Sequence, residues 1–458
     1  MDGMRIISMM WVVMGHTLVF VLMGAGFTNT ADVLPHDGEG VMARLSAQPI
    51  PGGLLAVDSF FFMSGFLLCA VLLKKMDAGG LGGGAWLPKA YLHRYLRVTP
   101  TLAFAMILQW KVLPLVGSGP LWGRLAGQVD ICHRYWWTEV TYVMNLVPWP
   151  PNLLSTCVGV SWYLGDDMQF FLVGLPLVAL YSRSRSLGWA TILSLLVASI
   201  TYTLWFAFDT GVASTIFAGM VTADGGGSFT EYYVVPWTRC PPYLIGMVTG
   251  LLWHTCFHGG ARSGYDFLAR PKVLAGLYLL GGALLALPVY GTYWANQDIT
   301  VAIPMWLDHM FLAFGKPAWA VGLAILSILC FSGHGGPVAA FLELDAWVPL
   351  SKLSFCAYLV HPLLFTWLYY SRPLPVKFTA VEYGVTYVGV LVGTFAGSVL
   401  LHLLVEAPLR NIEARARKGS PGGRTTRKAA SSGDPTPSAI AAPAASAPGP
   451  GGDSGSLA

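Results

Sequence analysis

Long apolar runs alternate with short polar segments along almost the whole chain of 458 residues. A run of about 20 apolar residues is long enough to cross a hydrocarbon core of about 30 Å. A backbone in lipid must satisfy its own hydrogen bonds, so each such run is predicted to be a helix. The pattern predicts an all-α, polytopic integral membrane protein of about ten transmembrane helices, at residues 6–27, 54–73, 99–116, 162–181, 188–208, 240–257, 272–290, 310–331, 350–370 and 384–405.

The composition agrees with this class, because 55% of the residues are hydrophobic and only 11% are charged, against about 25% charged residues in soluble domains. Most Lys and Arg residues fall in alternate connecting segments and near the carboxyl end. The positive-inside rule therefore predicts that both termini are cytoplasmic, and that the loops at 28–53, 117–161 and 209–239 face a lumen or the exterior. We expect a multi-pass protein of an endomembrane or the plasma membrane, in contact with membrane lipids and with no nucleic-acid partner.

Two domains are expected. Residues 1–412 hold all the apolar runs and form the transmembrane domain. Residues 413–458 are rich in Gly, Ala, Ser and Pro, a composition that cannot form a core, and are predicted to be a disordered cytoplasmic tail.

Two of the seven cysteines, Cys132 and Cys157, fall in the same long loop on the predicted non-cytoplasmic side. An oxidising compartment allows them to form a disulfide bond, and two free thiols are the alternative. The other cysteines lie in or beside apolar runs, where buried packing is usual. Since no CxxC or Cys/His spacing suggests a metal, we expect no metal site. We also expect no bound cofactor.

The first apolar run contains two ionisable residues, Arg5 and His16. Such residues are costly in lipid and indicate a functional site by default. Because they are eleven residues apart, they share one face of a helix, about 16 Å from each other along its axis. This places a titratable imidazole near mid-membrane, and His16 becomes the candidate catalytic base. The alternative is a histidine bonded to a neighbouring helix purely for packing.

Asp58 lies a few residues inside the second apolar run. Antiparallel helices joined by one loop usually pack together, so this carboxylate could orient or charge-balance His16. The alternative is a residue of the first helical turn that the helix dipole favours.

Arg94 and Arg97 lie three residues apart before the third apolar run, so on a helix they point the same way. Two guanidinium groups side by side at the membrane surface can grip a phosphate. Pairing with anionic lipid headgroups is the alternative.

Three further residues are secondary candidates. Asp166 and Asp167 enter the fourth apolar run, and at most one of them is expected in the site because adjacent helical residues diverge by about 100°. His361 lies in the ninth run, directly before Pro362, which frees a backbone carbonyl. Arg239 is not one of these three. It begins the sixth run and could bind a carboxylate or a sugar hydroxyl, or simply extend its charge to the interface.

Six motifs spread over residues 1–412 occur in the order seen in the acyltransferase family 3 membrane proteins. The later motifs are most similar to the eukaryotic branch named for the nose-resistant-to-fluoxetine proteins. The motifs are MDGMRIISMMWVVMGHT, AVDSFFFMSGFLL, RYLRVTP, CHRYWWTEV followed by CVGVSWYLGDDMQFF, VVPWTRCPPYLIGMVTG and LSKLSFCAYLVHP. Those eukaryotic proteins resemble this chain only in their second half, so we expect either a shortened form or a sequence without its start.

The resemblance implies an acyltransferase, for groups other than amino-acyl groups, that uses acyl-CoA as co-substrate and a carbohydrate, sterol or other lipid hydroxyl as acceptor. Carried over by position, the family's first-helix histidine and arginine fall on His16 and Arg5. The arginines of its loop motif fall on Arg94 and Arg97, and its second-helix acid on Asp58. His16 would then deprotonate the acceptor, Asp58 would orient it, and the arginines would hold the donor's phosphates.

A second hypothesis is a lipid or small-molecule transporter that keeps the fold without the chemistry. The combination of a candidate base with a candidate CoA clamp favours the enzyme, because a pure transporter needs neither. The absence of a visible inverted repeat also weakly disfavours a secondary transporter.

Overall fold

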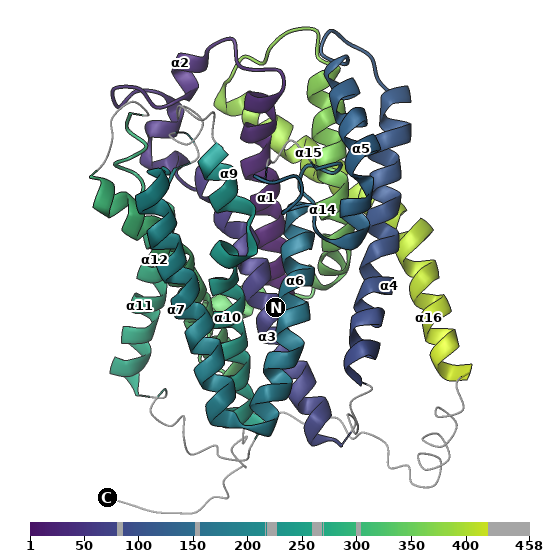
Figure 1. Ribbon diagram of the computed structural model, residues 1–458. Helices are drawn as coiled ribbons and strands as arrows, with labels where there is room; N and C mark the ends of the chain where they lie inside the picture. Colours follow the sequence, from purple (N-terminus) through teal and green to yellow (C-terminus); the bar gives the residue numbers. More distant parts are fainter. Residues whose placement is uncertain are drawn as a thin grey trace, which may run out of the picture. The chain divides into compact units, whose positions relative to one another are not determined.

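The computed structural model describes residues 1–79, 86–151, 156–215, 217, 227–258, 268, 270–298 and 304–419 (Figure 1). The described residues contain helices and no named strand. Residues Met1–Ala407 form one compact unit, separate from Pro408–Ala458. The α-helices are α1 (Asp2–Met23), α2 (Thr30–Val33), α3 (Ala56–Asp77), α4 (Trp86–Ile107), α5 (Arg124–Thr141), α6 (Trp162–Arg183), α7 (Arg185–Thr210), α9 (Gly227–Val234), α10 (Pro236–Trp253), α11 (Pro271–Tyr290), α12 (Met305–Phe331), α13 (Gly336–Leu342), α14 (Trp347–Tyr370), α15 (Ala380–Leu401) and α16 (Ala407–Gly419).

Nine helical segments in the described ranges are long and apolar enough to cross a membrane. They coincide with nine of the ten predicted runs, and the all-α membrane class is therefore confirmed. The remaining predicted run, at 240–257, corresponds to α10, which carries Arg239 and three prolines in its first two turns. Helix α2 lies at one end of the Met1–Ala407 unit, and the turn between α6 and α7 lies at the other (Figure 1).

Two segments differ from the prediction. Helix α4 begins at Trp86, well before the predicted start of the third run, and Pro100 lies inside it. Arg94 and Arg97 therefore belong to a helix and not to a loop. Helix α16 extends to Gly419, so the first residues of the predicted tail, 413–419, are helical, and 420–458 lie outside the described residues.

Helix α1 lies at the junction of two groups of packed side chains. Its Val12 belongs to a buried cluster with residues of α3, α6, α7 and α10. The next residue, Val13, belongs to a second cluster with residues of α4, α14 and α15. Because α1 contacts both groups, the side chains on its remaining faces lie between them.

Within the described residues, the most extensive contact between two helices joins α3 to α10. A methyl group added at Gly65 would overlap the carbonyl oxygen of Tyr243, and one added at Gly246 would overlap that of Phe62. The backbones therefore touch without an intervening side chain, as is common where small residues meet between membrane helices. This contact explains the glycines of the MSGF and LIGM motifs, which the sequence pattern alone left without a role.

Gly65→Ala is expected to destabilise the protein by about 1–3 kcal/mol, because overpacking forces the two backbones apart. Gly276→Ala on α11 is the matched control, since a methyl group there meets nothing within 4 Å and alanine is the better helix former by about 0.5–1 kcal/mol. Unfolding in micelles measures both variants. Equal stabilities of the two alanine variants would show that the α3–α10 contact can relax.

Helix α5 lies inside the predicted loop 117–161 and carries Cys132, which forms a disulfide bond with Cys157. Glu139, on the same helix, is fully buried near this bond. Its Oε1 accepts hydrogen bonds from the Ser161 hydroxyl at 2.9 Å and the Val158 amide at 3.2 Å. Burial outweighs these bonds and raises the pKa of Glu139 from 4.5 to about 7.

The stability of the fold should therefore fall as pH rises from about 4.5 to about 7. The buried carboxyl holds its proton more tightly than the unfolded chain does, so its contribution is complete below pH 4.5 and lost as pH passes 7. The loss is roughly 3 kcal/mol.

Unfolding of the parent and Glu139→Gln at pH 4.5 and 7.5 checks this pH dependence. The parent should lose more stability than Glu139→Gln over that interval, whereas Glu343→Gln, at an exposed position, should follow the parent. Identical pH profiles for the parent and Glu139→Gln would contradict the assignment.

Candidate active site

Two histidines from different helices contact each other inside the unit. Nδ1 of His16 on α1 lies 2.9 Å from Nε2 of His361 on α14. The rings are stacked, with centroids 5.1 Å apart and planes 13° apart. His361 is fully buried. The structure thus brings together the candidate base and a residue predicted only as a secondary candidate.

Hydrogen-bond geometry assigns the tautomers of the pair. Nδ1 of His361 lies 3.1 Å from the carbonyl oxygen of Ala357. A carbonyl only accepts, so this nitrogen carries the proton and Nε2 of a neutral His361 is an acceptor. Nδ1 of His16 must then donate to it. The other nitrogen of neutral His16, Nε2, is left with an unprotonated lone pair, which is what a general base requires.

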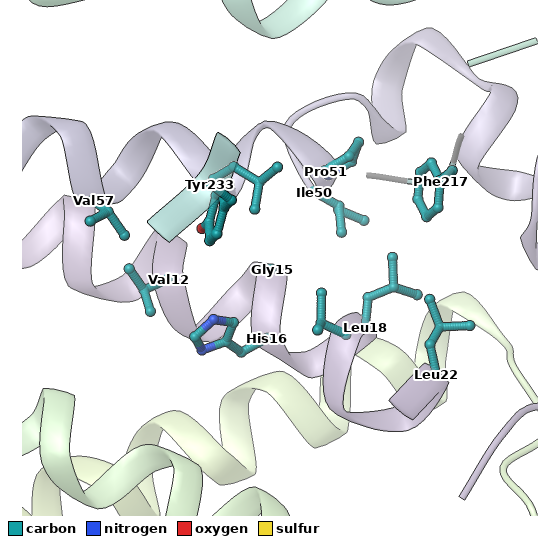
Figure 2. Close-up of a pocket in the computed structure, with 13 residues that line it drawn as sticks. Val12, Gly15, His16, Leu18, Leu22, Ile50, Pro51, Val57, Phe217 and Tyr233 are labelled. Atoms are coloured by element: carbon teal, nitrogen blue, oxygen red, sulfur yellow. The ribbon is translucent and has the colours of Figure 1, made fainter. Parts of the chain in front are cut away.

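His16 lines a cavity of about 30 Å³. Figure 2 shows its wall, which includes Gly15 and Leu18 of α1, Pro51 of the 3₁₀ turn Pro51–Leu55 (η3), and Tyr233 of α9. Most of the lining is apolar. A space of this size holds a hydroxyl group or a water molecule beside the imidazole.

Asp58 occupies a different position from the one predicted. Both of its oxygens accept hydrogen bonds from Nη1 of Arg239, at 2.9 and 2.8 Å, and both side chains are almost completely buried. The expectation that Asp58 orients His16 is therefore corrected. The side chain that contacts the imidazole of His16 is His361. A carboxylate on one membrane helix and a guanidinium on another pair because each would be costly alone in lipid.

The three predicted phosphate-binding arginines have different surroundings. Arg94 forms an ion pair with Asp167 of α6, and its guanidinium lies 4.3 Å from the centre of the Phe171 ring. Arg97 is exposed on the same helix. Arg5 donates to Asp2 at 3.4 Å. Arg94 is thus directed into the bundle, although the spacing predicted that Arg94 and Arg97 would share one direction.

The adjacent acids of α6 diverge, as their spacing predicts. Asp166 is fully buried, and its Oδ1 accepts a hydrogen bond from Asn145 at 2.7 Å. Asp167 faces Arg94 and also accepts from the Ser64 hydroxyl at 2.8 Å. Neither carboxylate lines the cavity beside His16.

A series of aromatic side chains reaches the histidine pair from α6. The Tyr163 ring lies 5.2 Å from that of Tyr358, which lies 5.5 Å from the ring of His361. The sequence reasoning missed Tyr358, although it stands three residues before His361 and so shares its helix face.

Two groups of side chains in the described ranges have the composition of a metal site. One joins Cys356 of α14 to His402 and Glu406, and the other consists of three residues of two loops, His36, Asp37 and Asp298. In the first group, Oε2 of Glu406 lies 2.8 Å from Nδ1 of His402 and 3.3 Å from Sγ of Cys356. These two hydrogen bonds already explain why the three side chains lie close together. Sequence spacing gave no sign of this group because its members come from different segments.

A family profile described as an acyltransferase domain matches residues 1–403. The chain is 29% identical, over 90% of its length, to nose resistant to fluoxetine protein 6 of Caenorhabditis elegans, and covers 50% of that protein. It is 22% identical, over 91% of its length, to regulator of hypoxia-inducible factor 1 of the same organism, and covers 80% of it.

Over 46% of its length the chain is also 24% identical to a Staphylococcus aureus protein named "Putative O-acetyltransferase", of which it covers 32%. The chain thus spans half the length of the first nematode relative and a third of the bacterial one. No solved structure matches.

Proposed function

The chain belongs to the acyltransferase family whose domain matches residues 1–403, and from this premise we propose that it moves an acyl group from acyl-CoA to a hydroxyl acceptor, with His16 as general base. The observation that carries the proposal is the histidine pair. His361 fixes the ring of His16 and leaves Nε2 as its free base, beside a cavity that admits a hydroxyl group.

The proposed step is direct transfer. Nε2 of His16 removes the proton of the acceptor hydroxyl, and the oxygen attacks the thioester carbonyl of the donor. The carbon–sulfur bond then breaks, an ester forms, and the thiolate of CoA takes the proton from His16. His361 keeps the imidazole of His16 oriented throughout. Its Nε2 accepts a hydrogen bond from Nδ1–H of His16 whether His16 is neutral or protonated.

We further propose that Arg5, Arg94 and Arg97 hold the phosphates of the donor. The acceptor is proposed to be a carbohydrate, sterol or other lipid, in an endomembrane or the plasma membrane. Both termini are proposed to be cytoplasmic, which places the arginines on the side that supplies acyl-CoA.

The test is transfer of label from acetyl-labelled acetyl-CoA by the purified full chain in lipid nanodiscs. Cholesterol in the disc and glucose in solution serve as hydroxyl acceptors, and water as the background acceptor. Labelled ester, or free labelled acetate above the rate of empty discs, supports the proposal. A folded protein that neither binds acetyl-CoA nor releases label contradicts it.

A further inference from the structure

A second cavity lies beside the one that His16 lines. The two share Pro51, Leu54 and Tyr233 in their walls. The second is larger, at about 80 Å³, and its wall carries charged and polar groups that the first lacks. Two of these groups, Arg239 and Lys316, carry nitrogen donors.

Two of the three guanidinium nitrogens of Arg239 donate hydrogen bonds to described residues. Its Nε donates to the Tyr233 carbonyl at 2.6 Å, and its Nη1 donates to both oxygens of Asp58. Its Nη2 has no hydrogen-bond partner in the part of the chain that the structure describes, although the residue is only 1% exposed. A buried donor left without a partner is costly, so a site for a ligand acceptor is indicated here.

Lys316 brings a second cation to the same wall. It is 6% exposed, and Nζ donates to the Thr238 carbonyl at 3.2 Å. The ammonium also lies 3.7 Å from the centre of the Tyr232 ring. An ammonium group has three N–H donors, so this environment leaves it with capacity for a ligand.

Asn296 supplies an acceptor. Its Nδ2 donates at 2.7 Å to Oε1 of Gln48, whose own amide nitrogen donates to the Met42 carbonyl at 2.9 Å. These two bonds fix the orientation of both amides. Oδ1 of Asn296 is buried and has no partner among the described residues. The wall therefore presents one neutral acceptor in addition to its two cationic donors.

The charges on the wall favour an anion. Asp58 is the single carboxylate among the lining residues, and Arg239 already occupies both of its oxygens. Asp166 also interacts electrostatically with Arg239 and Lys316, but it does not line the cavity and its Oδ1 faces Asn145. Within the described residues, Nη2 of Arg239 and Nζ of Lys316, both on residues of the cavity wall, therefore donate a hydrogen bond to neither acid.

We propose that this cavity binds a small hydroxy-carboxylate. The carboxylate accepts from Nη2 of Arg239 and from Nζ of Lys316, and the neighbouring hydroxyl donates to Oδ1 of Asn296. Such a ligand satisfies both orphaned polar atoms and offsets the positive charge of the wall. The inference concerns binding alone and holds whether or not His16 catalyses acyl transfer.

The experiment compares labelled lactate with labelled propionate, which differ by one hydroxyl, in equilibrium binding to the full chain in nanodiscs. We expect lactate to bind at least about tenfold tighter, because propionate leaves the buried Asn296 acceptor unpaired. Asn296→Leu should abolish this preference. Lys316→Met should weaken lactate binding at least tenfold.

Two controls separate this result from other effects. Lys111→Met removes a lysine that also lies over an aromatic ring, that of Trp110, at a position outside the cavity, and should bind lactate like the parent. His16→Ala should also bind lactate like the parent, which keeps this test independent of acyl transfer. Absence of saturable lactate binding by the folded parent, or equal affinities for lactate and propionate, would overturn the proposal. The ratio of the parent's affinities for lactate and propionate tests the proposal even if a variant fails to fold.

Discussion

Replacing His16 by alanine is expected to lower the rate of acyl transfer by a factor of about 10² to 10⁴, the range that a positioned general base contributes. The variant removes the nitrogen that takes the acceptor's proton and leaves His361, the aromatic path and the arginines in place. Release of acetyl label in nanodiscs, with the donor saturating, measures the effect. Donor binding should stay close to that of the parent, because the proposed phosphate contacts lie on other residues.

His133→Ala is the matched control for this experiment. His133 is an exposed histidine on α5, packed against Trp110, and does not line either cavity. It should transfer label at the parental rate. Equal rates for His16→Ala and the parent, with the donor bound in both, would exclude a general-base role for His16.

Asp58→Asn is expected to destabilise the protein by about 3–5 kcal/mol, the cost of removing one partner from a buried ion pair. The substitution leaves the positive charge of Arg239 without its carboxylate in a site where both side chains are 1% exposed. Unfolding in micelles at neutral pH measures the loss. The double variant Asp58→Asn with Arg239→Gln should recover part of it, because the uncompensated charge is then gone.

An exposed ion pair provides the comparison. Arg372 lies 3.0 Å from Glu382, with 29% and 40% of the two side chains exposed. Arg372→Gln should cost no more than about 1 kcal/mol, because water screens this pair. If Asp58→Asn costs as little as Arg372→Gln, the buried pair contributes far less than its geometry implies.

The sequence is sufficient to predict most of the helices, because lipid imposes two requirements on a spanning segment. Its backbone must be helical, and the side chains that face lipid must be apolar. The prediction failed where a helix is polar. Helix α4 continues through the polar stretch around Arg94, where hydropathy no longer marks it. Helix α5 lies in a predicted loop for the same reason, because its length and polarity do not resemble a span.

The sequence allows candidate site residues to be singled out, but it does not predict their contacts. His16 and Asp58 stood out because ionisable groups are rare in spans, yet nothing local says which helices are neighbours. The opposite charges of Asp58 and Arg239 would have been a usable signal, since two costly groups of opposite sign tend to pair. Asn296 gives no signal at all, because it lies in an irregular connection and acquires its role only from the fold.

The contact of α3 with α10 also limits how the protein can move. Packed helices shear past each other by small adjustments of the side chains between them, and at Gly65 and Gly246 there are none to adjust. The two helices should therefore move as one rigid body. Any opening of the cavities must then come from movement of the elements around α3 and α10. Pro51 and Leu54 of η3 stand in both cavity walls, so a single displacement of this short turn would admit molecules to both spaces together.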